Sequence, residues 1–147
     1  MTWPIIVAWI HYVSVMLMIA SLLGEHLLLK PVLTAPEVRT IRRLDIIYGG
    51  SATLLLVTGV MRMYLEKGTT YYLQSGAFHA LVGIFVLVAL LSIYPTVIFL
   101  RWRADAGAGR EIAPGQFGTM QIILRSELAL VLIAPLFATW MAHGALF

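Results

Sequence analysis

The histidines are the residues of this chain best suited to metal or redox chemistry. His11, His79 and His143 each fall near one end of a different long apolar segment. In a chain with four membrane spans, these three ends lie on the same side. Imidazole nitrogens bind haem iron and copper, and facing helices of a bundle can present them to one cofactor. We therefore expect a cofactor site in this half of the membrane, with His11 as an axial ligand of haem b and His79 opposite it.

Two basic residues belong to the same side of the predicted bundle. Arg62 closes the second apolar segment and Lys67 follows it. Guanidinium and ammonium groups are suited to carboxylates, so we expect Arg62 and Lys67 to bind the haem propionates. The alternative is a soft metal, because histidine and methionine without cysteine favour copper. A copper site would use His11, His79 and His143.

A second layer of ionisable residues lies toward the opposite side of the membrane. It contains Glu25, Asp45, Glu127 and Arg125. His11 and Glu25 share one face of a helix because they are separated by two heptads. We expect Glu25 to face the bundle and carry a proton. The alternative is a set of structural ion pairs, since Asp45 and Glu127 lie near helix starts, where carboxylates complement the helix dipole.

Four long apolar segments must position these residues. They span residues 4–29, 45–64, 77–100 and 120–142, and a bilayer-crossing helix needs about 20 residues. Hydrophobic residues make up 61% of the chain and charged residues only 12%. The pattern predicts an all-α fold, an integral membrane four-helix bundle forming a single transmembrane domain over residues 1–147. The absence of cysteine excludes disulfides and thiolate metal sites.

The basic residues predict how the bundle is oriented. Of ten Lys and Arg residues, eight fall in or beside the two loops that share one side: Lys30, Arg39, Arg42, Arg43, Arg101, Arg103, Arg110 and Arg125. The positive-inside rule then places both termini on the outer side. Topology explains the net charge of +3 better than nucleic-acid binding does. No basic residue precedes the first apolar segment, so we expect it to be retained rather than cleaved as a secretory signal.

Several short motifs resemble those of a known family. The chain carries them in this order: His11; Gly24-Glu25; Asp45 with Tyr48-Gly49; Thr58-Gly59 with Arg62; Lys67-Gly68 with Tyr71-Tyr72; Phe78-His79; Ser92 and Tyr94-Pro95-Thr96; Arg101-Trp102; Met141-Ala142 with Gly144. Over nearly its whole length the chain thus resembles an uncharacterised bacterial family of four-span membrane proteins, domain of unknown function family 2214. That family is distantly similar to HemJ-type protoporphyrinogen oxidases and CopD-like copper proteins.

The resemblance implies a bundle in the bacterial inner membrane and a haem b whose first-span ligand is His11. The HemJ-type enzymes also have a third-span lysine in a His-Ala-Lys-like segment, and here that position is Leu81, in His79-Ala80-Leu81. Leucine does not ligate iron, so His79 must substitute or the cofactor is absent. His143 stands where the resemblance predicts arginine. Oxidoreductase activity is therefore not transferred directly.

Three functions remain open at this point. The first is a haem b protein of electron transfer or porphyrin-related redox chemistry. The second is a copper-binding or copper-transporting protein. The third is a cofactor-free accessory subunit of a larger respiratory or photosynthetic complex. All three imply contact with the lipid bilayer, and we expect a homo-oligomer or a larger membrane complex.

Overall fold

Four long helices dominate the structure, a computed structural model that describes residues 2–102 and 107–144. They are α1 (Trp3–Leu28), α2 (Ala35–Leu65), α4 (Gly76–Arg101) and α5 (Pro114–Ala142). Each is long and apolar enough to cross a membrane. The predicted helical membrane bundle is confirmed at this level. Arg103, one of the residues used to predict the orientation, lies outside the described residues.

Two helices begin earlier than the predicted spans because their first turns are polar. α2 starts at Ala35 rather than Asp45, behind a capping box formed by Thr34 and Glu37. The Glu37 carboxylate accepts a hydrogen bond from the Thr34 backbone N–H at 2.9 Å and binds the Lys30 ammonium at 2.6 Å. α5 starts at Pro114, since proline suits the first turn, where its missing N–H costs nothing.

Three short elements complete the chain. The helix α3 (Thr69–Leu73) lies in the connection between α2 and α4. The strands β1 (Val32–Leu33) and β2 (Arg110–Glu111) pair antiparallel, with Val32 opposite Glu111 and Leu33 opposite Arg110. The prediction of an all-α fold therefore missed one small strand pair, which ties the α1–α2 connection to the α4–α5 connection. Two-residue strands carry too little pattern to be found in the sequence.

Gly109 allows this strand pair to form, and its replacement tests the contact. A Cβ atom on Gly109 would lie 2.7 Å from the backbone carbonyl oxygen of Leu33. We expect Gly109→Ala to lower the free energy of unfolding by about 1–3 kcal/mol, as overpacking does. Thermal unfolding in detergent measures the change. Gly107→Ala is the matched control, because nothing lies within 4 Å of its new Cβ, and equal melting temperatures for the two variants would contradict the prediction.

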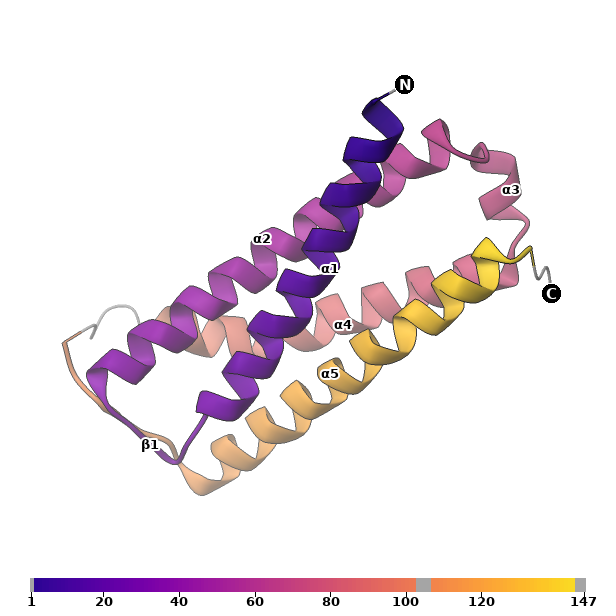
Figure 1. Cartoon of the computed structure of the whole chain (residues 1–147). Helices are drawn as coiled ribbons and strands as arrows, with labels where there is room; N and C mark the ends of the chain where they lie inside the picture. The colour runs from indigo at the N-terminus through magenta and orange to yellow at the C-terminus, as the bar shows by residue number, and fades with distance from the viewer. Residues whose placement is uncertain (1, 103–106, 145–147) are drawn as a thin grey trace.

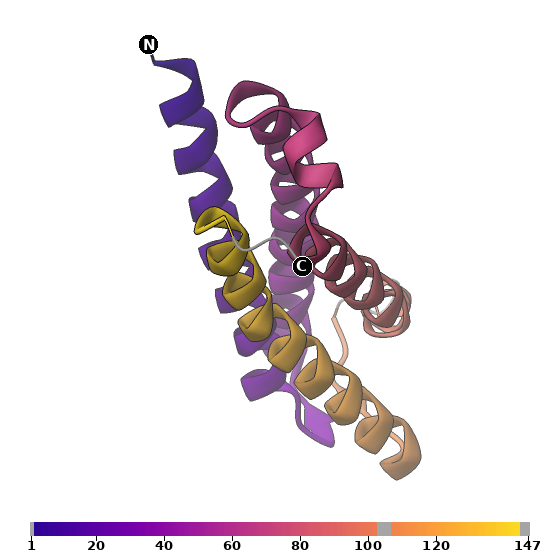
Figure 2. The ribbon, with the colours of Figure 1, turned by 90° about the vertical axis from the view of Figure 1, so that its right-hand side faces the viewer.

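The long helices pack as two pairs, α1 with α2 and α4 with α5. The pairs diverge toward the end of the bundle that carries α3 and both termini (Figure 1, Figure 2). We refer to this end as the terminal end and to the end that carries β1 and β2 as the strand end. Leu33, Ile41, Phe99, Met120 and Leu124, all 0–1% exposed, form the tightly packed core toward the strand end.

Candidate functional site

A cavity of about 570 Å³ lies between the two helix pairs at the terminal end. We call it the terminal cavity. Its volume falls in the range of small-molecule and cofactor sites, about 300–1,000 Å³. Val15, Leu55, Phe85, Val131 and Ala134 form part of its apolar wall and come from all four long helices. Such a wall suits a ligand with a large apolar body.

His11 is the histidine that lines this cavity. Its Nδ1 lies 2.9 Å from the Thr58 hydroxyl oxygen, and that hydroxyl lies 2.7 Å from the Leu54 carbonyl oxygen. The Thr58 hydroxyl donates its proton to the carbonyl, so it accepts a hydrogen bond from the N–H at His11 Nδ1. This arrangement leaves the lone pair on Nε2 free to bind a metal or accept a proton. The imidazole is thus held in one tautomer on the wall of the cavity.

Gly59 keeps the space beside the imidazole free. A Cβ atom at this position would lie 3.4 Å from His11 Cε1, at the near limit of ordinary van der Waals contact. Thr58 and Gly59 are adjacent on α2, so one turn of this helix both orients the ring of His11 and makes room for it.

Charged side chains line the mouth of the terminal cavity. Arg62 forms a salt bridge with Glu66, with 2.6 Å between Nε and Oε1, and its guanidinium lies 5.2 Å from the centre of the Tyr12 ring. The Tyr72 hydroxyl donates to Glu66 Oε2 at 3.2 Å. Burial, and then the negative charge of Glu66, raise the pKa of Tyr72. The Tyr72 hydroxyl therefore keeps its proton and remains a donor.

Lys67 lies at the same mouth and has neutral partners. Its ammonium donates to the Tyr71 hydroxyl at 3.2 Å and to the Ala142 carbonyl at 3.3 Å. The Tyr71 hydroxyl in turn donates to the Met141 carbonyl at 2.8 Å, which ties the α2–α4 connection to the end of α5. Arg62, Glu66 and Lys67 together give the mouth two positive charges and one negative, so it favours an acidic group.

The structure does not bring the other two predicted ligands to this cavity. His79 and His143 are exposed, and neither lines the cavity. The Nδ1 of each donates to a carbonyl one turn earlier in the chain, His79 to Ser75 at 2.8 Å and His143 to Thr139 at 2.9 Å. Leu81 does line the cavity. The position at which the resemblance predicts lysine therefore lies on the same cavity as His11, and His79 does not.

The predicted second layer forms a buried acidic cluster of Glu25, Asp45 and Glu127. These residues are 2%, 7% and 1% exposed and lie within electrostatic reach of one another. They come from α1, α2 and α5, and the Thr96 hydroxyl of α4 donates to Asp45 Oδ1 at 2.7 Å. Asp45 also lines a second cavity of about 260 Å³, which we call the Asp45 cavity.

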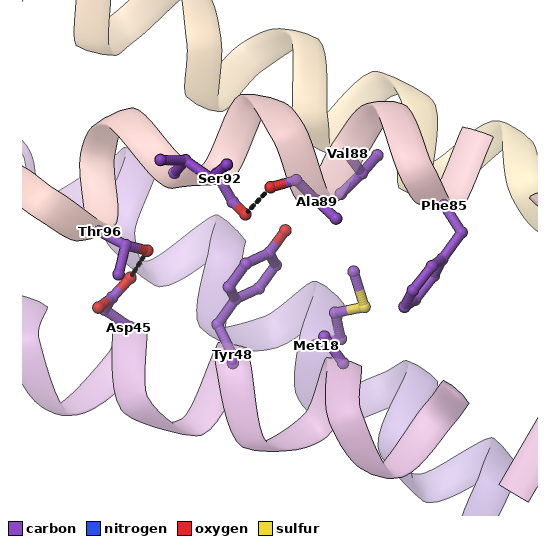
Figure 3. Close-up of a pocket in the computed structure, with 11 residues that line it drawn as sticks. Met18, Asp45, Tyr48, Phe85, Val88, Ala89, Ser92 and Thr96 are labelled. Carbon is purple, nitrogen blue, oxygen red and sulfur yellow. Dashed lines mark hydrogen bonds between the residues drawn. The ribbon is translucent and has the colours of Figure 1, made fainter. Parts of the chain in front are cut away.

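Figure 3 shows the wall of the Asp45 cavity, with the Tyr48 ring between the Asp45–Thr96 hydrogen bond and Met18. Arg125, the basic residue predicted to pair in this layer, is exposed. Within residues 2–102 and 107–144, no salt bridge joins it to the acidic cluster.

Comparison with protein-family models shows which family the chain belongs to. Residues 3–145 match the family described as "Predicted membrane protein (DUF2214)". The chain belongs to this family. No curated protein and no solved structure matches the chain. The family description establishes a membrane protein and does not assign a ligand or a reaction.

The DUF2214 chain does not gather its candidate metal ligands into one group. Among the described residues, no three or more His, Asp or Glu side chains are placed to hold a metal ion together. The prediction of copper bound by His11, His79 and His143 therefore has no geometric support from those residues. A site built on His11 must use a ligand that brings its own metal, or donors of another type.

Sequence reasoning missed Thr58, Glu66 and Tyr72 as residues of the site. Thr58 meets His11 from a position 47 residues away, on a neighbouring helix, and spacing within one helix does not reveal such a contact. For Glu66 a signal was present, because it follows Arg62 at the i,i+4 spacing that favours an ion pair on a helix.

Proposed function

We propose that this protein binds haem b in the terminal cavity through His11 and works in electron transfer or porphyrin-related redox chemistry. The observation that carries the proposal is the imidazole of His11 on the wall of a 570 Å³ cavity, with its Nδ1 proton directed to Thr58. A haem-ligating histidine needs its Nε2 lone pair free and its other nitrogen hydrogen-bonded. Haem iron, when bound, supplies one-electron chemistry that the side chains of this cavity lack.

The wall and the mouth of the terminal cavity also suit haem b. The apolar wall suits the porphyrin ring, and the excess positive charge at the mouth suits its propionates. Lys67 is the more available anchor because its hydrogen-bond partners are neutral, whereas the charge of Arg62 is already shared with Glu66. The proposal places Arg62, Lys67 and both termini on the outer side of the bacterial inner membrane, as the positive-inside rule predicts.

The proposal assigns the histidine ligand to His11 and no ligand to His79 or His143. Both of these side chains are exposed outside the cavity. Across the cavity from α1, helix α4 contributes apolar residues, including Leu81, Phe85 and Val88. A haem held by His11 therefore meets an apolar wall.

Copper binding is a second candidate, because three methionines line the same cavity as His11. These are Met18, Met63 and Met141. Thioether sulfur is a ligand that Cu(I) accepts. One histidine and methionines from three helices thus form a donor set that does not need His79 or His143. The third candidate, a cofactor-free accessory subunit, has no comparable feature of its own in the cavity.

An absorption spectrum separates these candidates. The detergent-purified protein is titrated with haem b, and spectra are recorded before and after dithionite reduction, with metal analysis of the untreated sample. A saturable Soret band that shifts on reduction is the expected result. Stoichiometric copper without haem binding would favour the second candidate. A metal-free protein that neither changes the haem spectrum nor retains copper would overturn both, and co-purified large partners would then favour the accessory subunit.

Removal of the Thr58 hydroxyl tests how His11 is oriented. Thr58→Val keeps the shape of the side chain but removes the acceptor for the N–H at His11 Nδ1. We expect haem affinity to fall by about 10–100-fold, as is typical when a metal ligand loses its hydrogen-bond partner. Haem titration followed by the Soret band measures the change. Thr53→Val is the control, because Thr53 is an exposed residue of the same helix whose hydroxyl donates to the Gly49 carbonyl. Equal affinities for the two variants would rule out this role of Thr58.

A further inference from the structure

The acidic cluster of Glu25, Asp45 and Glu127 has more carboxyl oxygens than hydrogen-bond donors. Glu25 Oε1 and both carboxyl oxygens of Glu127 are buried with no hydrogen-bond partner among the described residues. Glu25 is 2% exposed and Glu127 is 1% exposed. Both lie within electrostatic reach of Asp45, so the three carboxyls form one buried group. A buried polar atom without a partner normally indicates an ordered water, an ion or a functional proton.

The charges around the cluster do not balance if all three carboxyls are ionised. α1 contributes Glu25, α5 contributes Glu127, and α2 contributes Asp45 and Tyr48. α4 contributes the neutral hydroxyls of Thr96 and Ser92 to the wall of the Asp45 cavity. Of the described cations, the one found within electrostatic reach of the cluster is Arg42, near Asp45.

One cation can compensate one carboxylate. Two further negative charges would remain buried in a helix bundle within the membrane, where even one unpaired ion is costly. The described residues also place no group of three or more such side chains to hold a metal ion together. Protons can supply the missing positive charge without such a group.

We propose that the acidic cluster is a proton-binding site in which Glu25 and Glu127 are protonated at neutral pH and Asp45 exchanges protons with water. Protonation turns each glutamate into a neutral group that both donates and accepts hydrogen bonds. It removes the uncompensated charge and supplies the donors that the unpartnered oxygens lack.

The Asp45 cavity gives water a place beside the cluster. Its volume of about 260 Å³ exceeds the roughly 30 Å³ share of one water molecule, and Asp45, Tyr48, Ser92 and Thr96 supply polar groups to its wall. Tyr48 lies within electrostatic reach of all three carboxyls of the cluster. In Figure 3 its hydroxyl points across the cavity toward Ser92 and Ala89 of α4. Asp45 is thus the member of the cluster that water in this cavity reaches.

The two cavities share part of their walls. Met18, Phe85 and Val88 line both the Asp45 cavity and the terminal cavity. The proton site therefore lies directly behind the wall of the cavity that contains His11. The proton site does not depend on the identity of the ligand in the terminal cavity.

Infrared spectroscopy of the haem-free protein tests the site directly. Protonated carboxylic acids have a carbonyl stretching band that carboxylates lack. We expect this band at pH 7 in the wild-type protein, and a downshift of the band in D₂O if the protons exchange with water. Glu25→Gln and Glu127→Gln should each remove part of the band, and the double variant should remove it. Glutamine has the shape of a protonated glutamate, so the variants should keep their helical circular dichroism.

Glu66→Gln is the matched control, because Glu66 forms a salt bridge with Arg62 at the mouth of the terminal cavity, outside the acidic cluster. This variant should leave the band unchanged. A wild-type protein without the band at pH 7 would overturn the proposal even if no variant folds. A band that survives in the Glu25→Gln, Glu127→Gln double variant would also overturn it, and a band that does not shift in D₂O would exclude exchange with water.

Discussion

Replacement of His11 by alanine is expected to abolish specific haem binding and the Soret band that reports it. His11 is the histidine on the wall of the terminal cavity, and its hydrogen bond to Thr58 leaves Nε2 as the available ligand atom. Loss of the ligand itself should cost more than the roughly 10–100-fold loss of affinity that follows loss of a ligand's hydrogen-bond partner. A titration of detergent-purified His11→Ala with haem b, followed by the Soret band, measures the effect.

Two controls separate ligation from folding in this experiment. His79→Ala and His143→Ala remove exposed histidines outside the cavity and should bind haem as the wild-type protein does. His11→Gly with added imidazole should regain the Soret band, because free imidazole replaces the missing side chain in a bundle that is still folded. Haem binding that survives in His11→Ala but disappears in His79→Ala would reverse the assignment of the ligand.

Hydropathy predicted the helices because each one must offer about 20 apolar residues to the lipid. The same physical requirement blurs the helix ends, where polar first turns such as Thr34–Glu37 extend beyond the apolar segment. Thr34 and Glu37 stand at the spacing of a capping box, so this helix start was readable from the sequence. The β1–β2 pair was not, because its two strands approach each other only through the packing of the helices.

The position of a residue along the bundle could be predicted, but the direction of its side chain could not. His11, Arg62 and Lys67 were expected at one depth, and all three line the terminal cavity. His79 was expected at the same depth, but it is exposed and does not line the cavity. Leu81 is two residues later on α4, about 200° around a helix with 3.6 residues per turn, and it does line the cavity. A hydrophobic segment does not reveal which of its faces meets the partner helices when lipid is as apolar as the core.

The acidic cluster also shows which side-chain directions the sequence could predict and which it could not. The heptad spacing of His11 and Glu25 correctly predicted that Glu25 faces the bundle, where it is 2% exposed. The alternative of structural ion pairs was based on Asp45 and Glu127 lying near helix starts, but their helices begin at Ala35 and Pro114. It also included Arg125, which lies near Glu127 in the sequence. Arg125 and Glu127 are two residues apart on one helix, so their side chains point in different directions. Arg125 is exposed while Glu127 is buried, and this difference is what leaves the cluster short of positive charge.

Replacement of Leu81 by lysine is expected to add a second nitrogen ligand for a haem bound in the terminal cavity. Leu81 lines this cavity from α4, whereas His11 lines it from α1. The long side chain of lysine places a nitrogen donor in an otherwise apolar part of the wall. A second nitrogen ligand should convert the haem to a low-spin state, with sharper α and β bands after reduction. Spectra of the haem-loaded variant over a range of pH measure this change.

The pH dependence distinguishes ligation from a simple effect of charge. Only the neutral amine of lysine ligates iron, so the low-spin fraction of Leu81→Lys should rise as the pH increases. Leu81→Arg is the matched control, since a guanidinium has similar length and charge but does not deprotonate in proteins. A buried cation in a membrane span is costly, so both variants should insert less efficiently than the wild-type protein. Identical spectra for the lysine and arginine variants would show that position 81 does not reach the iron, and the haem would then have to lie elsewhere in the terminal cavity.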